Sequence, residues 1–290
     1  MAEPLPLCHL NGVVMPLGEA RISPLDRGFL YGDGVYEVTP VYGGRPFRHR
    51  EHMTRLRRSL AAIRLRDPHD PGRWDALIAE LIGRNGGGDQ YLYLQVSRGA
   101  EYGRNHAPLP DIAPTVFAFC APLPTPDPAV FERGIRCITT TDTRWARCDI
   151  KSVSLLANVL LRQLAIDAGA QETILIRDGL LTEASSSAVH VVVDGVLIAP
   201  PHSPRILPGT TRAMIEELAT AAGVPLQTRD VTEQELRNAD EIWLSAAIRG
   251  LAPVTLLDGR PVGAGIPGPV WRRMHAEFMS LIASLAGTPW

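Results

Sequence analysis

A cluster of prolines divides this chain of 290 residues near its middle. The segment APLPTPDPAV, residues 121–130, contains four prolines in ten residues. Because proline has a fixed φ and no backbone N–H, this segment favours an extended connector over a helix or the interior of a sheet. We therefore predict an N-terminal domain over residues 1–120, a linker over 121–130 and a C-terminal domain over 131–290.

The N-terminal part has the pattern of a small α+β domain. Alternating apolar residues between turn residues predict a hairpin, a pair of strands around Gly43 and Gly44, and a later strand. Apolar positions at helical spacing predict two amphipathic helices. These elements cover residues 9–23, 34–47 and 89–99 for the strands, and 51–64 and 71–88 for the helices.

The larger C-terminal part mixes strands and helices without regular alternation. A strand over 134–141 precedes a helix over 153–168 and a meander over 172–200, whose turns are Asp178-Gly179 and Asp194-Gly195. A helix over 211–222, a strand over 239–247 and a final helix over 267–286 follow. This order predicts a largely antiparallel or barrel-like α/β domain.

Charge and composition exclude several classes of protein. The net charge is −2, and the basic residues form no stripe, so nucleic acid and membrane are not expected partners. The start MAEPLPLCHL lacks the pattern of a signal peptide, which favours the cytoplasm. The four cysteines form no C-x-x-C pair and the histidines no H-E-x-x-H spacing, so we expect reduced thiols and no metal site.

Lys151 precedes an apolar run over residues 153–161 that we expect to be buried. Burial disfavours the charged form of an amine, and a neutral amine is a nucleophile that can condense with a carbonyl. Lys151 is therefore a candidate Schiff-base residue. The alternative is an ordinary lysine at the start of a helix, whose charged end reaches water.

Three further features favour the Schiff-base interpretation. Glu183 lies beside three serines in LTEASSS, where a carboxylate could hold a heterocyclic nitrogen protonated. Gly209-Thr210-Thr211 opens a helix, whose N-terminal N–H groups suit a phosphate. Arg55 lies on a helix, on the same face as His52. Each feature also has an ordinary structural explanation, but together they are the parts that pyridoxal 5′-phosphate (PLP) requires.

The order and spacing of several motifs resemble the class IV (fold type IV) PLP-dependent aminotransferases, most of all the D-amino acid transaminases. The motifs are DRGFLYGDGVYEVTPVYGGRPF, EHMTRL, DTRWARCDIKS, LTEASSS, ILPGTTR and ADEIWLS. The resemblance covers about residues 10–285. It implies the fold of that family, with a smaller N-terminal domain and a larger, barrel-like PLP domain.

The resemblance also implies roles for single residues. Lys151 would bind the cofactor as a Schiff base and move the substrate proton, and Glu183 would pair with the pyridine nitrogen. The remaining implied contacts are to the phosphate or the ring, and they fall on Arg55, Ser185, Ser186, Leu207, Gly209, Thr210, Thr211 and Ala247. Ala188 and His190 depart from the asparagine and aromatic residue of the class pattern, and Ala246 and Ala247 stand where the strand near the phosphate usually ends in serines and threonines. We therefore expect weaker cofactor retention.

Arg104 and His106, spaced Arg-x-His in a Gly- and Pro-rich loop, could both bind one substrate carboxylate. This resembles the carboxylate site of D-amino acid transaminases, with Tyr36 as a third donor and the loop reaching the active site of the neighbouring subunit. The resemblance thus implies a homodimer that exchanges an amino group between D-alanine or a similar D-amino acid and 2-oxoglutarate. Alternatives are an aminodeoxychorismate lyase, a branched-chain or (R)-amine transaminase, and a non-catalytic protein of the same fold.

Overall fold

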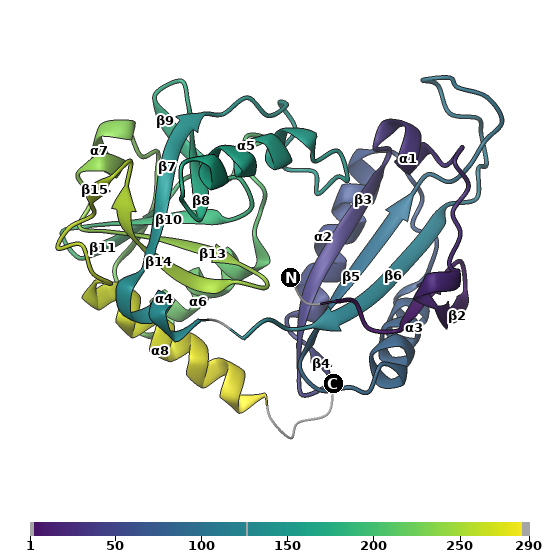
Figure 1. The fold of residues 1–290 in the computed structure, drawn as a ribbon, viewed down its shortest axis with the longest axis horizontal. Helices are drawn as coiled ribbons and strands as arrows, with labels where there is room; N and C mark the ends of the chain where they lie inside the picture. Colours follow the sequence, from purple (N-terminus) through teal and green to yellow (C-terminus); the bar gives the residue numbers. More distant parts are fainter. Residues whose placement is uncertain (1–2, 126, 286–290) are drawn as a thin grey trace. The chain divides into compact units, whose positions relative to one another are not determined.

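The computed structural model describes residues 3–125 and 127–285. The chain forms two compact units (Figure 1). Unit 1 comprises the described residues of Met1–Pro124, together with Ile150–Ser154 and Leu285. Unit 2 comprises the described residues of Thr125–Asp149 and Leu155–Ser284. The domain boundaries expected from the sequence stay a prediction, and residues 1, 2, 126 and 286–290 of those ranges lie outside the described residues.

Unit 1 is built on one antiparallel sheet in the order β2-β1-β6-β5-β3-β4. Its strands are β1 (Leu7–Leu10), β2 (Val13–Pro16), β3 (Gly34–Tyr42), β4 (Arg45–Pro46), β5 (Gln90–Ser97) and β6 (Thr115–Pro122). Its helices are α1 (Arg27–Tyr31), α2 (His49–Ala62) and α3 (Pro71–Arg84), with a 3-10 turn at Leu17–Glu19. The predicted hairpin, paired strands and two amphipathic helices are confirmed.

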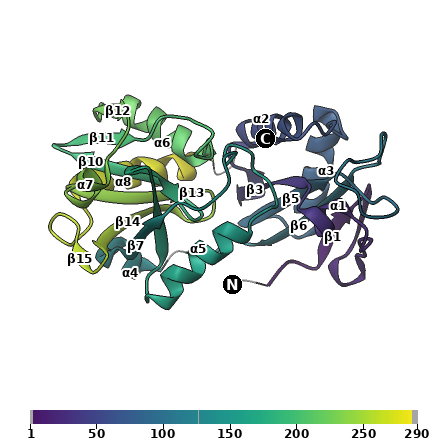
Figure 2. The same ribbon diagram turned by 90° about the horizontal axis from the view of Figure 1, so that it is seen from above.

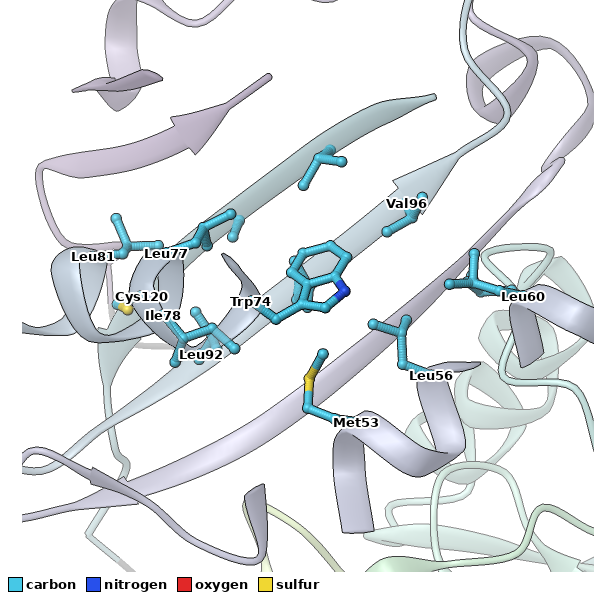
Figure 3. Close-up of a cluster of buried hydrophobic side chains, with 14 of the residues drawn as sticks. Met53, Leu56, Leu60, Trp74, Leu77, Ile78, Leu81, Leu92, Val96 and Cys120 are labelled. Atoms are coloured by element: carbon cyan, nitrogen blue, oxygen red, sulfur yellow. The ribbon is translucent and has the colours of Figure 1, made fainter. Parts of the chain in front are cut away.

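Helices α2 and α3 cover one face of this sheet (Figure 2). Met53, Leu56 and Leu60 of α2 meet Trp74 of α3 above the inward-facing side chains of the strands, as Figure 3 shows. Trp74 and Leu56 are fully buried. Each such large side chain contributes on the order of 2 kcal/mol by leaving water, so this core holds β3 and α2 in fixed positions.

The opposite face of the same sheet carries a row of half-buried aromatic rings. Tyr36 on β3 stacks on Tyr93 of β5 at 5.6 Å, and Tyr93 stacks on Phe119 of β6 at 5.2 Å between ring centroids. Successive residues of a strand point to opposite faces, so Tyr36 lies on this aromatic face and Glu37 on the helix side. Burial and the neighbouring Tyr36 raise the pKa of Tyr93 to about 12.

Unit 2 contains a curled, mixed sheet in the order β12-β11-β10-β13-β14-β7-β8-β9, with β15 added beside β14. Its strands are β7 (Ile135–Thr141), β8 (Glu172–Arg177), β9 (Leu180–Ala184), β10 (Ala188–Val193), β11 (Val196–Ala199), β12 (Leu226–Thr228), β13 (Glu241–Ala246), β14 (Gly250–Leu257) and β15 (Arg260–Pro261). Its helices are α4 (Pro128–Arg133), α5 (Leu156–Asp167), α6 (Thr210–Ala221), α7 (Glu233–Arg237) and α8 (Pro269–Ser284).

The two Asp-Gly hairpins, β8–β9 and β10–β11, are confirmed. The predicted continuous meander is wrong, because β9 pairs with β8 while β10 pairs with β11 and β13. Asp178 and Asp194 both have positive φ, 54° and 51°, and each is followed by a glycine with positive φ. These are the dihedral signs of the two-residue turns that match the twist of a hairpin. Within the sheet, β7 runs parallel to β8 and to β14, while β10 and β13 pair antiparallel. The fold is therefore mixed α/β, as expected.

The expectation that the run after Lys151 is buried is wrong. Helix α5 begins at Leu156, three residues later than predicted, and the side chains of Leu156, Val159 and Leu160 are 72%, 60% and 60% exposed. Leu161 is buried against unit 2. The helix is amphipathic, but much of its apolar surface faces outward, which a count of apolar residues cannot reveal.

Two elements extend into the predicted linker. Strand β6 continues to Pro122, and α4 begins at Pro128, where proline serves as the first helical residue. Residue 286 of the predicted final helix lies outside the described residues. Within the described parts of the chain, no helix is long and apolar enough to span a lipid bilayer.

Candidate active site

Lys151 lies in the short segment Ile150–Ser154, which packs on β3 in unit 1. Its carbonyl accepts a hydrogen bond from the N–H of Tyr36 at 3.0 Å, and its own N–H donates to Ser59 Oγ at 3.2 Å. Its side-chain nitrogen Nζ lies 4.0 Å from the centroid of the Tyr36 ring. Two of the predicted site residues are thus in contact, and backbone hydrogen bonds fix the point from which the amine projects.

Arg55, also in unit 1, is bonded to a carboxylate that the sequence analysis did not identify. Its Nε and Nη2 donate to Glu37 at 2.8 and 2.7 Å, and His52 Nδ1 lies 2.7 Å from the same carboxylate. Burial alone would raise the pKa of Glu37, but the charge and hydrogen bonds of Arg55, with His52, lower it to about 2. Burial lowers the pKa of His52, with Glu37 opposing part of that effect.

Glu183 is the penultimate residue of β9 in unit 2 and is buried. It accepts a hydrogen bond from Arg144 Nη1 and another, at 3.1 Å, from the N–H of Leu207. Arg144 is shared with Asp142, whose two oxygens it reaches at 2.9 and 2.8 Å. Burial raises the pKa of Glu183, and Arg144 offsets only part of that rise. The structure therefore brings Glu183 and Leu207 together, as expected for one site.

The serines after Glu183 point to a second buried carboxylate. Ser185 and Ser186 both donate to Glu172, the fully buried first residue of β8, with Ser186 at 2.8 Å. Arg249 lies 3.4 Å from the same carboxylate. The carbonyl of Ser185 accepts a hydrogen bond from Asn158 at 2.8 Å. These bonds hold the turn between β9 and β10. The contact of the two serines with the cofactor stays a prediction.

The predicted phosphate-binding backbone opens α6. Gly209 is the N-cap residue, without a side-chain cap, and Thr210 and Thr211 are the first helical residues. The first N–H groups of a helix have no acceptor within it, so this end of α6 presents donors. Ala247 begins the tight turn between β13 and β14 and is half-buried.

Arg104 and His106 lie in the loop between β5 and β6, which extends beyond the strand ends in Figure 1. Both side chains are exposed, and both lie against the ring of Tyr31: Arg104 Cζ is 5.2 Å and the His106 ring 5.7 Å from its centroid. The structure thus brings this pair together. Tyr36 has its ring contacts elsewhere in unit 1, with Lys151 and Tyr93.

His190, one of the departures from the class pattern, is fully buried on β10. Its Nε2 lies 2.9 Å from Ser245 Oγ, and its ring stacks on Trp243 at 4.9 Å. Burial and then the charge of Arg212 lower its pKa to about 3, so it is neutral at physiological pH. The Ser245 hydroxyl is therefore engaged by His190 inside unit 2.

Comparison with known proteins identifies the family. Residues 34–257 match the family described as amino-transferase class IV. The chain belongs to this family. It is 38% identical over 274 residues to the D-alanine aminotransferase of Bacillus licheniformis, covering 94% of this chain and 96% of that protein. It is 37% identical over 276 residues to the D-alanine aminotransferase of Staphylococcus aureus, covering 95% and 97%.

Solved structures of the class IV aminotransferase fold agree closely with this chain. The T.th. branched-chain amino acid aminotransferase with pyridoxamine 5′-phosphate has a TM-score of 0.91 at 28% identity, covering 99% of this chain and 97% of that one. The Escherichia coli branched-chain amino acid aminotransferase has a TM-score of 0.89 at 26% identity, covering 97% and 95%. This class IV aminotransferase is a PLP-dependent enzyme of fold type IV.

The charged partners of the predicted site residues are what sequence reasoning missed in this aminotransferase. Glu37, Arg144 and Glu172 were not assigned roles, although Glu37 and Arg144 lie in motifs that were recognised. One signal was available for Glu37: it alternates with Tyr36 on an apolar strand, and an inward-facing carboxylate requires a cation. No comparable signal marked Glu172.

Proposed function

We propose that this chain is a D-amino acid transaminase that transfers the amino group of D-alanine, or a similar D-amino acid, to 2-oxoglutarate. The observation that carries the proposal is the exposed pair Arg104 and His106 beside one tyrosine ring, a cationic site suited to a carboxylate. The relatives named D-alanine aminotransferase at 38% and 37% identity support it.

Lys151 is proposed to hold the PLP aldehyde. It is the one lysine among the 29 basic residues of the chain, so no other side chain offers an amine. No ion pair engages it among the described residues, and its Nζ lies 4.0 Å from the centroid of the Tyr36 ring. An amine without a carboxylate partner can serve as a nucleophile and then accept and return a proton.

Glu183 is proposed to face the ring nitrogen of the cofactor. Its carboxylate is buried, and burial raises its pKa. A carboxylate of this kind suits a partner that shares a proton with it, as the pyridine nitrogen of PLP would. The bound cofactor supplies an electron sink for the bond broken at the substrate α-carbon. Arg144 and the N–H of Leu207 orient Glu183 for that contact.

The remaining proposed contacts take up the phosphate and the ring faces. Arg55 and the start of α6, with Gly209, Thr210 and Thr211, would bind the phosphate. Leu207 would pack on the ring, and Ser185, Ser186 and Ala247 would line the site. Arg104, His106 and Tyr36 would bind the substrate carboxylate.

A substrate panel tests the proposal. D-alanine, L-leucine and (R)-1-phenylethylamine are each offered with 2-oxoglutarate, and we expect D-alanine to be the preferred donor. Preference for L-leucine would instead support the branched-chain activity named for the neighbouring structures. Release of pyruvate from aminodeoxychorismate without an acceptor would indicate the lyase.

Borohydride reduction tests the cofactor assignment separately from the substrate. Since the chain has a single lysine, the reduced adduct must appear on the peptide containing Lys151. A colourless protein with no adduct would support a non-catalytic role. Loss of activity on dialysis against cofactor-free buffer is expected from the departures at Ala188 and His190, and full activity after long dialysis would contradict it.

A second copy of this chain is proposed as the partner that covers α5. Leu156, Val159 and Leu160 expose their apolar side chains along one helix, and a patch of this kind is typical of a protein interface. Light scattering should give the mass of a homodimer, and Leu160→Glu should shift it toward the monomer. The four buried, unpaired cysteines support a reducing compartment, and we propose the cytoplasm.

A further inference from the structure

Arg27 of unit 1 is a buried cation that none of the proposed roles uses. It is the first residue of α1, and its side chain is 4% exposed. Its Nε donates to Asp33 at 2.9 Å, and its Nη1 forms an ion pair with Glu101. A guanidinium so enclosed needs acceptors for its remaining donors.

Those acceptors are two backbone carbonyls of the β5–β6 loop. Nη1 donates to the carbonyl of Asn105 at 2.7 Å, and Nη2 donates to the carbonyl of His106 at 2.9 Å. Asn105 and His106 follow Arg104 directly, so one planar guanidinium fixes the backbone from which both proposed carboxylate ligands project. Lysine could not match this fork, because its ammonium is a single point of charge.

The side chains of the pair rest on the same short helix. Tyr31, four residues after Arg27 on α1, lies under the Arg27 guanidinium at 4.5 Å and also contacts Arg104 and His106. Helix α1 is itself tied to the base of the loop, since the N–H of Arg27 donates to the carbonyl of Gly99 at 2.9 Å. Gly99 has a φ of +99°, and a Cβ there would collide with the carbonyl oxygen of Ala113.

Glu101 extends the anchor to the far side of the pair. Its second oxygen accepts a hydrogen bond from the N–H of Leu109 at 2.9 Å. That N–H and the Arg27 cation lower the pKa of Glu101, so the carboxylate stays ionised. By contrast, the intervening Tyr102 side chain is 96% exposed, which means that the loop does not hold its path by packing its own side chains.

We propose that Arg27 is a positioning residue for the substrate carboxylate. It sets the loop so that Arg104 and His106 present their charges together before substrate arrives. This inference rests on the proposed carboxylate role of that pair. Preorganisation of this kind acts on the binding of groups that carry a carboxylate and leaves the reacting atoms untouched.

The test compares Arg27→Lys with a matched control, Arg98→Lys. Arg98 bonds the same Asp33, at 2.7 Å, but its other donors go to the carbonyls of Ile63 and Arg64, outside the loop. For Arg27→Lys holoenzyme we expect KM for D-alanine to rise about tenfold with kcat within threefold. Arg98→Lys should leave KM for D-alanine within about twofold.

D-alaninamide, which lacks the carboxylate, supplies a readout that a merely structural role would not move. Its slow single-turnover reaction with the holoenzyme should be unchanged in Arg27→Lys. Parallel losses with D-alanine and D-alaninamide, or equal rises of KM in both arginine variants, would overturn the inference. If Arg27→Lys does not fold, Glu101→Gln releases the second anchor while retaining Arg27, and it should raise KM for D-alanine and spare D-alaninamide.

Arg104→Gln separates this inference from the proposed function. If that variant leaves KM for D-alanine unchanged, the carboxylate role of the pair fails, and the role of Arg27 fails with it. If Arg104→Gln raises KM and Arg27→Lys does not, only the positioning role of Arg27 is wrong.

Discussion

Two buried carboxylates in this aminotransferase, Glu37 in unit 1 and Glu183 in unit 2, each pair with an arginine but differ in their charge balance. Glu37 is the shared acceptor of Arg55 and His52, so one acid meets two nitrogen-bearing side chains. Arg144, the one cation paired with Glu183 in the described chain, is shared with Asp142, which also pairs with Arg177 at 3.0 Å. The pKa falls to about 2 at Glu37 and rises at Glu183.

The difference shows that burial alone does not set the behaviour of an acid, because both carboxylates are nearly inaccessible, at 1% and 7% exposure. The two carboxylates differ in how much of the cost of burying their negative charge is offset by a neighbouring cation. Glu37 is a fixed anion that holds Arg55 in place. Arg144 offsets only part of the rise that burial causes in the pKa of Glu183, and the proposed partner, a protonated ring nitrogen, would supply a further positive charge.

The largest effect is expected from Glu37→Gln. Removing the carboxylate that Arg55 and His52 share should lower the free energy of unfolding by about 3 to 5 kcal/mol, as for other broken buried ion pairs. Urea denaturation measures it. Glu233→Gln is the control, since its 2.7 Å pair with Arg237 is largely exposed and should contribute less than about 1 kcal/mol. Equal effects of the two variants would remove the distinction drawn for Glu37.

Acid should weaken the wild-type protein through Glu37. Its folded pKa of about 2 lies below the unfolded value of 4.5, so its stabilisation is complete above pH 4.5 and is lost as pH falls toward 2. The loss should be roughly 3 kcal/mol at most, and Glu37→Gln should lack it. Unfolding free energies of both proteins across this range give the comparison, and parallel pH curves would contradict it.

Glu183→Gln should act on rate rather than on stability. Arg144 keeps both bonds to Asp142, so no buried cation is left alone and unfolding should change by less than about 1 kcal/mol. Transamination should slow by about a hundredfold, the usual cost of removing one preorganised charge. Single-turnover rates with D-alanine test this prediction, and a loss of stability as large as that of Glu37→Gln would refute the contrast.

The smallest effect at neutral pH is expected from substituting His190, a buried titratable group without an acid partner in the described chain. Its folded pKa of about 3 lies below the unfolded 6.5, so protonation opposes folding as pH falls through that window. His190→Phe should cost about 1 kcal/mol at neutral pH through the lost Ser245 bond, yet weaken less in acid. Ser245→Ala loses the same bond and should keep the acid sensitivity.

Most of the fold followed from local pattern. Strand alternation, helical spacing and Asp-Gly turns located the hairpins and the longer helices, because each depends on residues close together in the chain. The eight-residue strands β6 and β14 and the short helices α1, α4 and α7 were not predicted. The exposure of Leu156 and Leu160 did not follow, since a helix with apolar residues on several faces does not reveal which face its own unit covers. The start of α4 inside the proline-rich segment also escaped, because proline disfavours a helix only beyond its first turn.

The chemistry divides in the same way. The sequence by itself determined that Lys151 carries the only side-chain amine and that Glu183 lies at the end of a strand before a hydroxyl-rich turn. Only the tertiary structure decided which cation answers each buried acid. Arg144 and Glu183 are 39 residues apart, and Arg27 and His106 79 residues apart. Such partners meet because distant segments pack together in the folded chain. Their separation in the sequence follows no regular pattern that could predict the pairing.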